Sequence, residues 1–119
     1  MQPDPFAGRL ATVRHRFAST LAAKISDACA ALPQLSGNDI AVAEKLADTY
    51  RQIHGIGGIG SMVGFVATGK AARVAEDVLL PPFRAKRGLT DDEARNLRKE
   101  LETLRTVAQF ELQSINHAA

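Results

Sequence analysis

The sequence predicts an all-α protein, folded as an up-and-down antiparallel four-helix bundle. Apolar residues recur at steps of three and four along most of the chain, which is typical of amphipathic helices. Short segments rich in Gly, Pro, Ser and Asn separate these stretches, and no stretch alternates as a strand does. Short connections between amphipathic helices favour antiparallel neighbours, and 119 residues fit a single domain spanning residues 1–119.

Composition excludes several classes of protein. A net charge of +2 is too small to indicate a nucleic-acid partner. The single cysteine, Cys29, cannot form an internal disulfide or a zinc site built of several thiolates, and it fits a reducing compartment. No apolar run approaches the roughly 20 residues of a membrane span, and the N-terminus lacks the pattern of a signal peptide. We therefore expect a cytoplasmic monomer that has no membrane association.

The first two helices are predicted from their apolar stripes and end signals. Asp4 followed by Pro5 can begin a helix that Pro33 ends. Asn38 or Asp39 can cap the second helix, and Gly64 is a natural terminator for it. The first stripe consists of Phe6, Leu10, Val13, Phe17, Leu21, Ile25, Ala28 and Leu32, and the second of Val42, Leu46, Thr49, Ile53, Ile56, Gly60 and Val63.

The other two helices follow after short connections. A third helix is predicted over about Val66 to Leu80, with Pro81-Pro82 ending it and a loop over Pro82–Leu89. Thr90-Asp91-Asp92-Glu93 is a capping box that opens the last helix. The stripe of that helix consists of Ala94, Leu97, Leu101, Leu104, Ala108, Leu112 and Ile115.

His54 is the first candidate functional residue. At 100° per residue it lies about 120° from the centre of the second helix's apolar stripe, on the side of Ala47 and Gly58. Small residues therefore flank the imidazole, and another protein could approach it closely. The simpler interpretation is an ordinary surface histidine. His15 and His117 lack partners at ligand spacing, so we expect no metal site.

The third helix can supply groups to His54. If the turn centres near Gly64 and Phe65, then His54 and Glu76 are equidistant from it and lie level in the antiparallel pair. A carboxylate there can accept a hydrogen bond from one ring nitrogen and leave the other as a nucleophile. Lys70 and Arg73 lie between the turn and Glu76, where either could neutralise an anion on His54. Alternatively, Glu76 pairs with Lys70 or Arg73 on its own helix.

The run from His54 to Phe65 resembles the signature of histidine-containing phosphotransfer domains. In that family the pattern is His-x-Ile/Leu-Lys-Gly, with a further Gly ten residues after the His, often followed by Phe or Leu. The matching residues here are His54, Ile56, Gly58, Gly64 and Phe65. Glu76 matches a position where the family often has Glu or Gln bonded to the imidazole. Gly57 stands where the family usually has a lysine that stabilises the phosphoryl group.

The resemblance implies a phosphocarrier, not a kinase, in a multistep two-component phosphorelay. His54 would accept a phosphoryl group, Glu76 would orient its ring, and Lys70 or Arg73 would stabilise the phosphoryl group. The implied partners are response-regulator receiver domains and a hybrid histidine kinase. The receiver would supply an acidic pocket, a lysine and Mg²⁺, so this chain binds no cofactor itself. A receiver docking patch is expected at Ala47, Gly55, Gly57, Gly58 and Gly64.

Two other interpretations concern the same segment. A helical adaptor of the same shape, in which His54 is never phosphorylated, would also carry this surface. The run Gly55–Gly60 suggests a nucleotide-binding fingerprint, but that motif needs a preceding strand, and here a helix precedes it. The basic residues Arg84, Lys86 and Arg87 are most simply a solvated loop, or they steer an acidic partner surface.

Overall fold

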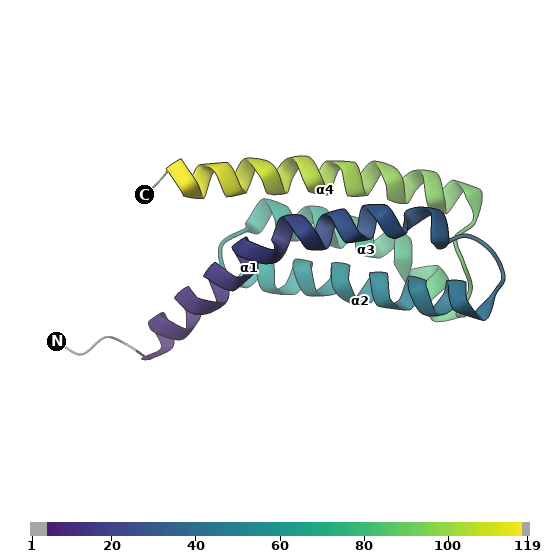
Figure 1. Ribbon diagram of the computed structural model, residues 1–119, viewed down its shortest axis with the longest axis horizontal. Coiled ribbons are helices and arrows are strands. Elements are labelled where there is room, and N and C mark those ends of the chain that lie inside the picture. The colour runs from purple at the N-terminus through teal and green to yellow at the C-terminus, as the bar shows by residue number, and fades with distance from the viewer. Residues whose placement is uncertain (1–4, 118–119) are drawn as a thin grey trace.

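The computed structural model describes residues 5–117, with side chains described through residue 115, and it confirms the four-helix bundle (Figure 1). Asp4, the expected first cap, lies outside the described residues. The elements are α1 (Pro5–Ala31), the short 3-10 helix η1 (Leu32–Gln34), α2 (Ile40–Met62), α3 (Val66–Ala85) and α4 (Asp91–His117). Asp39 occupies the cap position of α2, although its side chain makes no capping hydrogen bond.

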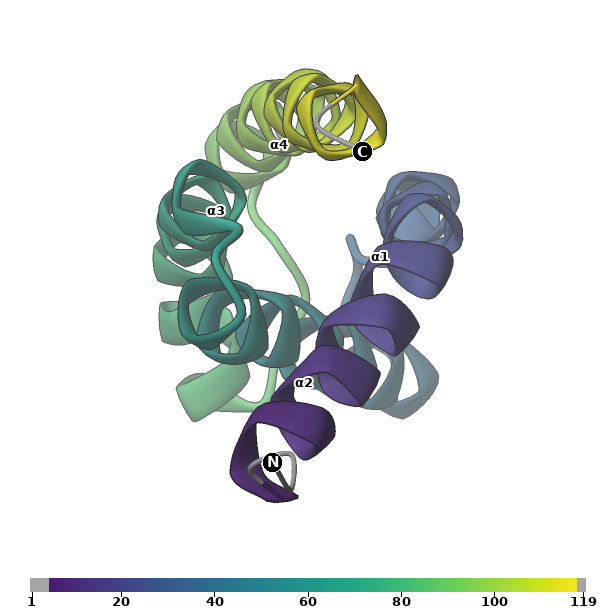
Figure 2. The ribbon, with the colours of Figure 1, turned by 90° about the vertical axis from the view of Figure 1, so that its left-hand side faces the viewer.

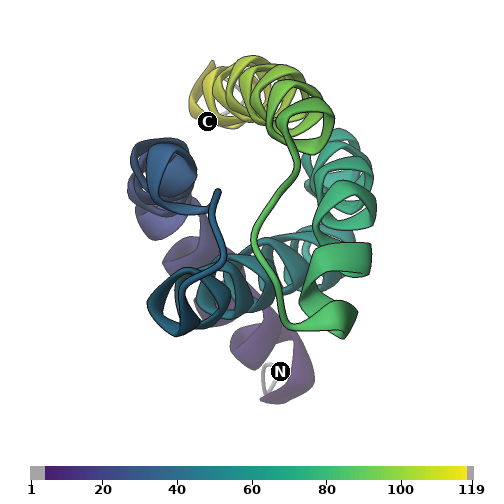
Figure 3. The ribbon, with the colours of Figure 1, turned by 90° about the vertical axis from the view of Figure 1, so that its right-hand side faces the viewer.

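Each helix packs against its neighbours in chain order, and α4 returns to α1 (Figure 2). Residues 5–117 contain no strand, only one isolated bridge between Ser36 and Leu89. The amide of Leu89 donates to the carbonyl of Leu35 at 2.8 Å, which joins the two connections at one end of the bundle (Figure 3). Among the described helices, none is both long and apolar enough to cross a membrane.

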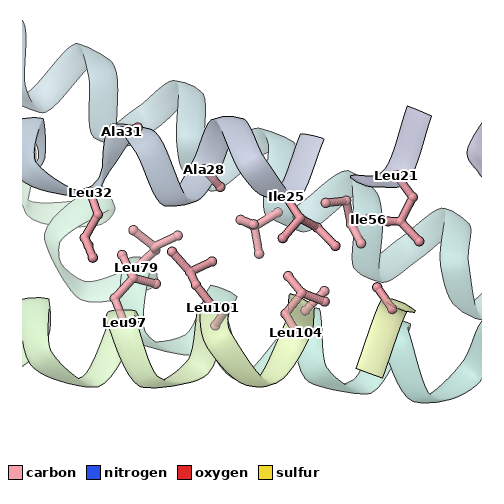
Figure 4. Close-up of a cluster of buried hydrophobic side chains, with 14 of the residues drawn as sticks. Leu21, Ile25, Ala28, Ala31, Leu32, Ile56, Leu79, Leu97, Leu101 and Leu104 are labelled. Carbon is pink, nitrogen blue, oxygen red and sulfur yellow. The ribbon is translucent and has the colours of Figure 1, made fainter. Parts of the chain in front are cut away.

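The core is mostly aliphatic and lies along the bundle axis (Figure 4). It also contains two phenylalanines, Phe17 and Phe65, whose ring centroids are 5.0 Å apart. Leu21 and Ile25 of α1 face Leu101 and Leu104 of α4, and all four side chains are buried. The stripe of α2 is likewise buried from Leu46 to Val63. The 3.6-residue periodicity therefore identifies the inner faces correctly over the middle of α1, α2 and α4.

The stripes of α1 and α4 extend beyond the core. Phe6 is 70% exposed and Ile115 is 42% exposed. Contrary to expectation, neither side chain is buried in the core. The first turns of α1 lead away from the bundle, where no other helix covers them (Figure 1). Apolar spacing predicts a helix face, but burial also requires a helix opposite that face.

The predicted end of the third helix at Pro81-Pro82 is wrong, and the expected loop from Pro82 is helical as far as Ala85. Interior prolines remove two backbone donors and disfavour this arrangement. Packing compensates, because Pro82 is buried and the ring of Phe83 stacks on Tyr50 with centroids 4.1 Å apart. The helix ends only at Lys86, whose φ of 55° is left-handed.

Side chains from the outer helices hold the turn between α2 and α3. Gly64 adopts a φ of +96° after α2, as a helix terminator does. Arg14 of α1 donates from Nε to the carbonyl of Val63 at 2.9 Å. Glu111 of α4 accepts hydrogen bonds from the amide and the hydroxyl of Thr68, each at 2.6 Å. The bonds to the Val63 carbonyl and from the Thr68 amide satisfy backbone groups that helix ends leave unpaired, and Glu111 places an anion at the start of α3.

The capping box of α4 is present. The amide of Glu93 donates to Thr90 Oγ1 at 3.2 Å, and the amide of Thr90 donates to Glu93 Oε1 at 2.9 Å. Arg87 donates two hydrogen bonds to the same carboxylate, at 2.7 and 3.2 Å. These bonds from Arg87, helped by those from Thr90, hold the pKa of Glu93 below its ordinary value. Arg87 is therefore engaged in an ion pair at the start of α4.

Missing side chains allow α2 and α3 to approach closely. A Cβ on Gly69 would overlap Ser61 Oγ and lie 3.2 Å from the carbonyl oxygen of Gly57. A Cβ on Gly60 would lie 3.1 Å from the ring of Phe17 and 3.4 Å from the carbonyl oxygen of Phe65. Ser61 Oγ itself donates to the carbonyl of Gly57 at 2.9 Å. Gly69 therefore allows the close approach of α2 and α3, and Gly60 also makes room for the ring of Phe17 from α1.

We predict opposite effects of alanine at two glycines of this helix pair. Gly69→Ala should lower the free energy of unfolding by about 1–3 kcal/mol, because the added methyl overpacks the α2–α3 contact. Gly58→Ala should raise it by about 0.5–1 kcal/mol, because a Cβ there meets no atom within 4 Å and alanine favours the helix. Urea unfolding followed by circular dichroism measures both. Equal effects of the two substitutions would contradict the close approach.

Candidate functional site

His54 lies on the outward face of α2, and 66% of its side chain is exposed. Its neighbours Ile53 and Ile56 are buried in the core. The helix therefore anchors the backbone on both sides of His54, while the imidazole remains accessible to another molecule.

Glu76 of α3 contacts the ring of His54. Its Oε1 lies 2.7 Å from His54 Nδ1, so the two residues predicted to be level are in hydrogen-bond contact. An ionised carboxylate only accepts, so Nδ1 carries the proton and donates it, and Nε2 keeps its lone pair. The side chain of Glu76 is only 19% exposed, which limits competition from water. Within the described residues no ion pair joins Glu76 to Lys70 or Arg73, the other partners considered for it.

Arg73 and Lys70 lie in α3 between the α2–α3 connection and Glu76, one helical turn apart. Both side chains are exposed. The Cγ of Arg73 lies beside Gly57 of α2, since a Cβ on Gly57 would be 3.3 Å from it. Arg73 therefore lies one helical turn from Glu76, and Lys70 lies about one turn further away.

The small residues around His54 have different environments. Gly57 is buried against α3, so it is not part of an exposed docking patch, contrary to expectation. Gly58 is exposed, and a Cβ on Gly55 or Gly58 would meet no atom within 4 Å. Ala47 is half-buried, and Gly64 is exposed in the turn, ten residues from His54. An open surface next to the imidazole is thus provided by Gly55 and Gly58.

An aromatic column beside His54 was not identified from the sequence. The ring of Tyr50, one turn earlier in α2, stacks on the imidazole with centroids 5.9 Å apart and an interplanar angle of 18°. The ring of Phe83 stacks on Tyr50 from α3, and the Arg51 guanidinium lies 5.9 Å from the centroid of Phe83. The four-residue spacing of Tyr50 and His54 was a usable signal. Phe83 could not be placed, because a loop was expected there.

An open groove of about 630 Å³ continues from this column toward the start of α2. Its apolar lining includes Ile40, Ala47 and Phe83, and Ile40 is 76% exposed. Arg84 and Lys86 of the α3 end also line the groove. Because Ala47 lies two turns before His54 on the same face of α2, a protein covering the imidazole can also reach the groove.

In the part of the chain that the structure describes, no cluster of three or more His, Cys, Asp or Glu side chains could hold a metal ion. His15 is exposed on α1, and the side chain of His117 lies outside the described residues. The chemistry available at the site is therefore that of an exposed nucleophile, an orienting carboxylate and nearby cations.

A family model described as Hpt domain matches residues 12–107, which include every element named above except the first turns of α1 and the last turns of α4. No curated protein and no solved structure matches the chain closely enough to count as similar.

We predict that the carboxylate of Glu76 sets the tautomer of His54. Glu76→Gln should lower the ratio of the Nδ1–H to the Nε2–H form about tenfold, because a charge-assisted hydrogen bond becomes a neutral one. Side-chain ¹⁵N chemical shifts of His54 at about pH 8.5, above the usual titration range of imidazole, measure the ratio. Asp77→Asn, at an exposed carboxylate on the same helix, is the matched control. An unchanged ratio in Glu76→Gln would show that another group sets the tautomer.

Proposed function

The chain belongs to the Hpt domain family, which mediates histidine phosphotransfer in phosphorelays, and on this premise we propose that it is a phosphocarrier acting through His54. His54 accepts a phosphoryl group from the aspartyl phosphate of one receiver domain and passes it to another receiver. The main support is the hydrogen bond between Glu76 and Nδ1 of an exposed histidine, which leaves Nε2 free to react.

The proposed transfer needs no proton movement on the carrier. The Nε2 lone pair of His54 attacks phosphorus, an N–P bond forms, and the P–O bond to the aspartyl carboxylate breaks in line. The proton on Nδ1 stays in place, so the phosphorylated ring carries a positive charge. Glu76, 2.7 Å away, balances that charge. The reverse step follows the same path, because the imidazole leaves as a neutral ring.

Cations for the phosphoryl group would come from α3. Gly57 carries no charge, and the stem of Arg73 occupies the space beside it. We assign phosphoryl stabilisation to Arg73, with a smaller contribution from Lys70, which lies a turn further along. Each is an exposed residue whose long side chain can turn toward an anion on Nε2.

The partners proposed are response-regulator receiver domains and a hybrid histidine kinase as the source of phosphoryl groups. The receiver would bring Mg²⁺, an acidic pocket and a lysine, so the carrier contributes a positioned nucleophile and a docking surface. We place that surface on Ala47, Gly55 and Gly58 and on the groove that continues from them. In this role the chain is a carrier and has no kinase activity of its own.

We predict that His54→Gln abolishes phosphoryl transfer. Receiver domains charged with a small phosphodonor should add a single acid-labile, alkali-stable phosphoryl group to the wild-type chain, measured by intact mass. His54→Gln should take none, because the amide has no lone pair of comparable nucleophilicity. His15→Gln, at another exposed histidine, should behave as wild type.

The same experiment distinguishes the carrier from an adaptor. If the folded wild-type chain takes no phosphoryl group from any receiver yet binds one, and His54→Gln binds it equally well, the chain is a non-phosphorylated adaptor and the carrier function is wrong.

We predict a graded effect for the cations. Arg73→Gln should slow phosphorylation of His54 by about two- to fivefold, the range of an exposed charge pair, and Lys70→Gln should slow it less. Arg98→Gln, at an exposed arginine of α4, provides the control for a change of net charge. If Arg73→Gln and Arg98→Gln have equal effects, only net charge matters and Arg73 has no local role.

A further inference from the structure

We propose that Tyr50 is a positioning residue for His54, which holds the imidazole plane so that Nε2 points outward in one direction. The consequence for phosphoryl transfer rests on the proposed carrier function. The stacking itself does not, because it follows from the contact between the two rings.

One hydrogen bond does not fix an imidazole on a helix surface. The bond from Nδ1 to Glu76 holds one corner of the ring, while 66% of the His54 side chain is exposed to solvent. The ring can still turn about its bond to Cβ, and this motion changes the direction in which Nε2 points. A second contact on the face of the ring is needed to stop this motion.

Tyr50 provides that contact. Its ring is nearly parallel to the imidazole, with an interplanar angle of 18° and centroids 5.9 Å apart. This separation is within the range of offset-stacked aromatic pairs. Both residues lie on α2, one turn apart, so the helix itself keeps the two rings in register. Glu76 thus restrains the ring within its plane, and Tyr50 restrains it out of that plane.

Phe83 in turn holds Tyr50. The two rings are 4.1 Å apart with an interplanar angle of 15°, and Tyr50 is half-buried between Phe83 and His54. Phe83 follows Pro81-Pro82 in the final turn of α3, where Pro82 is buried. The helical turn through the two prolines therefore holds Phe83 against Tyr50, which a loop starting at Pro82 would not do.

The expected consequence is a faster reaction at Nε2. An in-line attack needs the lone pair aimed at phosphorus, and a ring held in one orientation avoids losing that alignment. The effect should appear with any phosphodonor, including one too small to touch Tyr50. That property separates positioning from a docking role of the aromatic column.

The test uses the full chain with phosphoramidate as donor, so no receiver is present. Phosphoramidate transfers its phosphoryl group to Nε2, the P–N bond of the donor breaks, and its protonated amine leaves as ammonia. Tyr50→Leu should slow phosphorylation of His54 by about three- to tenfold, the range expected from losing an aromatic pair. Tyr50→Phe should stay within about twofold of wild type, because it keeps the ring. Phe110→Leu, at an aromatic residue of α4 that is 71% exposed, is the matched control.

A second readout does not depend on phosphorylation. In Tyr50→Leu, ¹³C relaxation of the His54 ring should show a lower order parameter, while Tyr50→Phe should keep the value of the wild type. Phe83→Leu, on the other helix, should lower both the rate and the order parameter less than Tyr50→Leu does. If the loss of any aromatic ring lowered the rate and the order parameter of His54, Phe110→Leu would lower them as well. Circular dichroism verifies that each variant is folded.

The outcomes decide the two proposals separately. An unchanged order parameter in folded Tyr50→Leu overturns the positioning role, whatever the rates. A lower order parameter together with an unchanged rate also overturns it, because the restraint would not serve the reaction. If the wild type is not phosphorylated by phosphoramidate or by any receiver, the carrier function fails. The positioning role for transfer then fails with it, and the relaxation data still show whether Tyr50 restrains the ring.

Discussion

The close approach of α2 and α3 is the constraint on which the site depends. It requires glycine at positions where a single methyl group would meet backbone or side-chain atoms, above all Gly69 and Gly60. Once the helices are that close, their register is fixed on both sides of the turn at Phe65. His54 and Glu76, 22 residues apart in sequence, then lie within 2.7 Å. The reactive geometry is thus a consequence of helix packing, and α1 and α4 reinforce it by binding both sides of the turn.

Glycines in α2 have two distinct roles that the sequence alone does not separate. Each interior glycine disfavours the helix by about 1 kcal/mol, so a run of them needs a structural reason. Gly57 and Gly60 face inward and allow packing, whereas Gly55 and Gly58 face outward and leave open space around the imidazole. Because the helix turns by about 100° per residue, the glycines between Gly55 and Gly60 alternate between its inner and outer faces. Of the glycines of this run that were expected in the docking patch, Gly57 is buried, and the approach of a partner to Gly55 and Gly58 stays a prediction.

Sequence reasoning succeeded where the signal is local and failed where a distant residue decides. Periodicity gave the inner faces of α1, α2 and α4, and equal spacing from the turn gave the pairing of His54 with Glu76. The end of α3 was wrong, because proline predicts a break locally while Tyr50, more than 30 residues away, stacks on Phe83 and stabilises one more turn. The burial of Gly57 was missed for the same reason, since its neighbour Arg73 belongs to the other helix.

The same packing brings the side chain of Arg73 beside position 57, where this chain has glycine. A Cβ there would lie 3.3 Å from Arg73 Cγ and 3.6 Å from the carbonyl oxygen of Gly69, so a side chain on α2 and the stem of Arg73 compete for one space. In this chain Arg73 occupies it. Arg73 is three residues from Glu76 on α3, so one helix carries both the carboxylate that contacts His54 and, in the proposed carrier, the cation assigned to the phosphoryl group. We expect a lysine at position 57 to move the stem of Arg73 by a few tenths of an ångström, because the Cβ of that lysine would lie close to Arg73 Cγ, a side-chain atom that can shift.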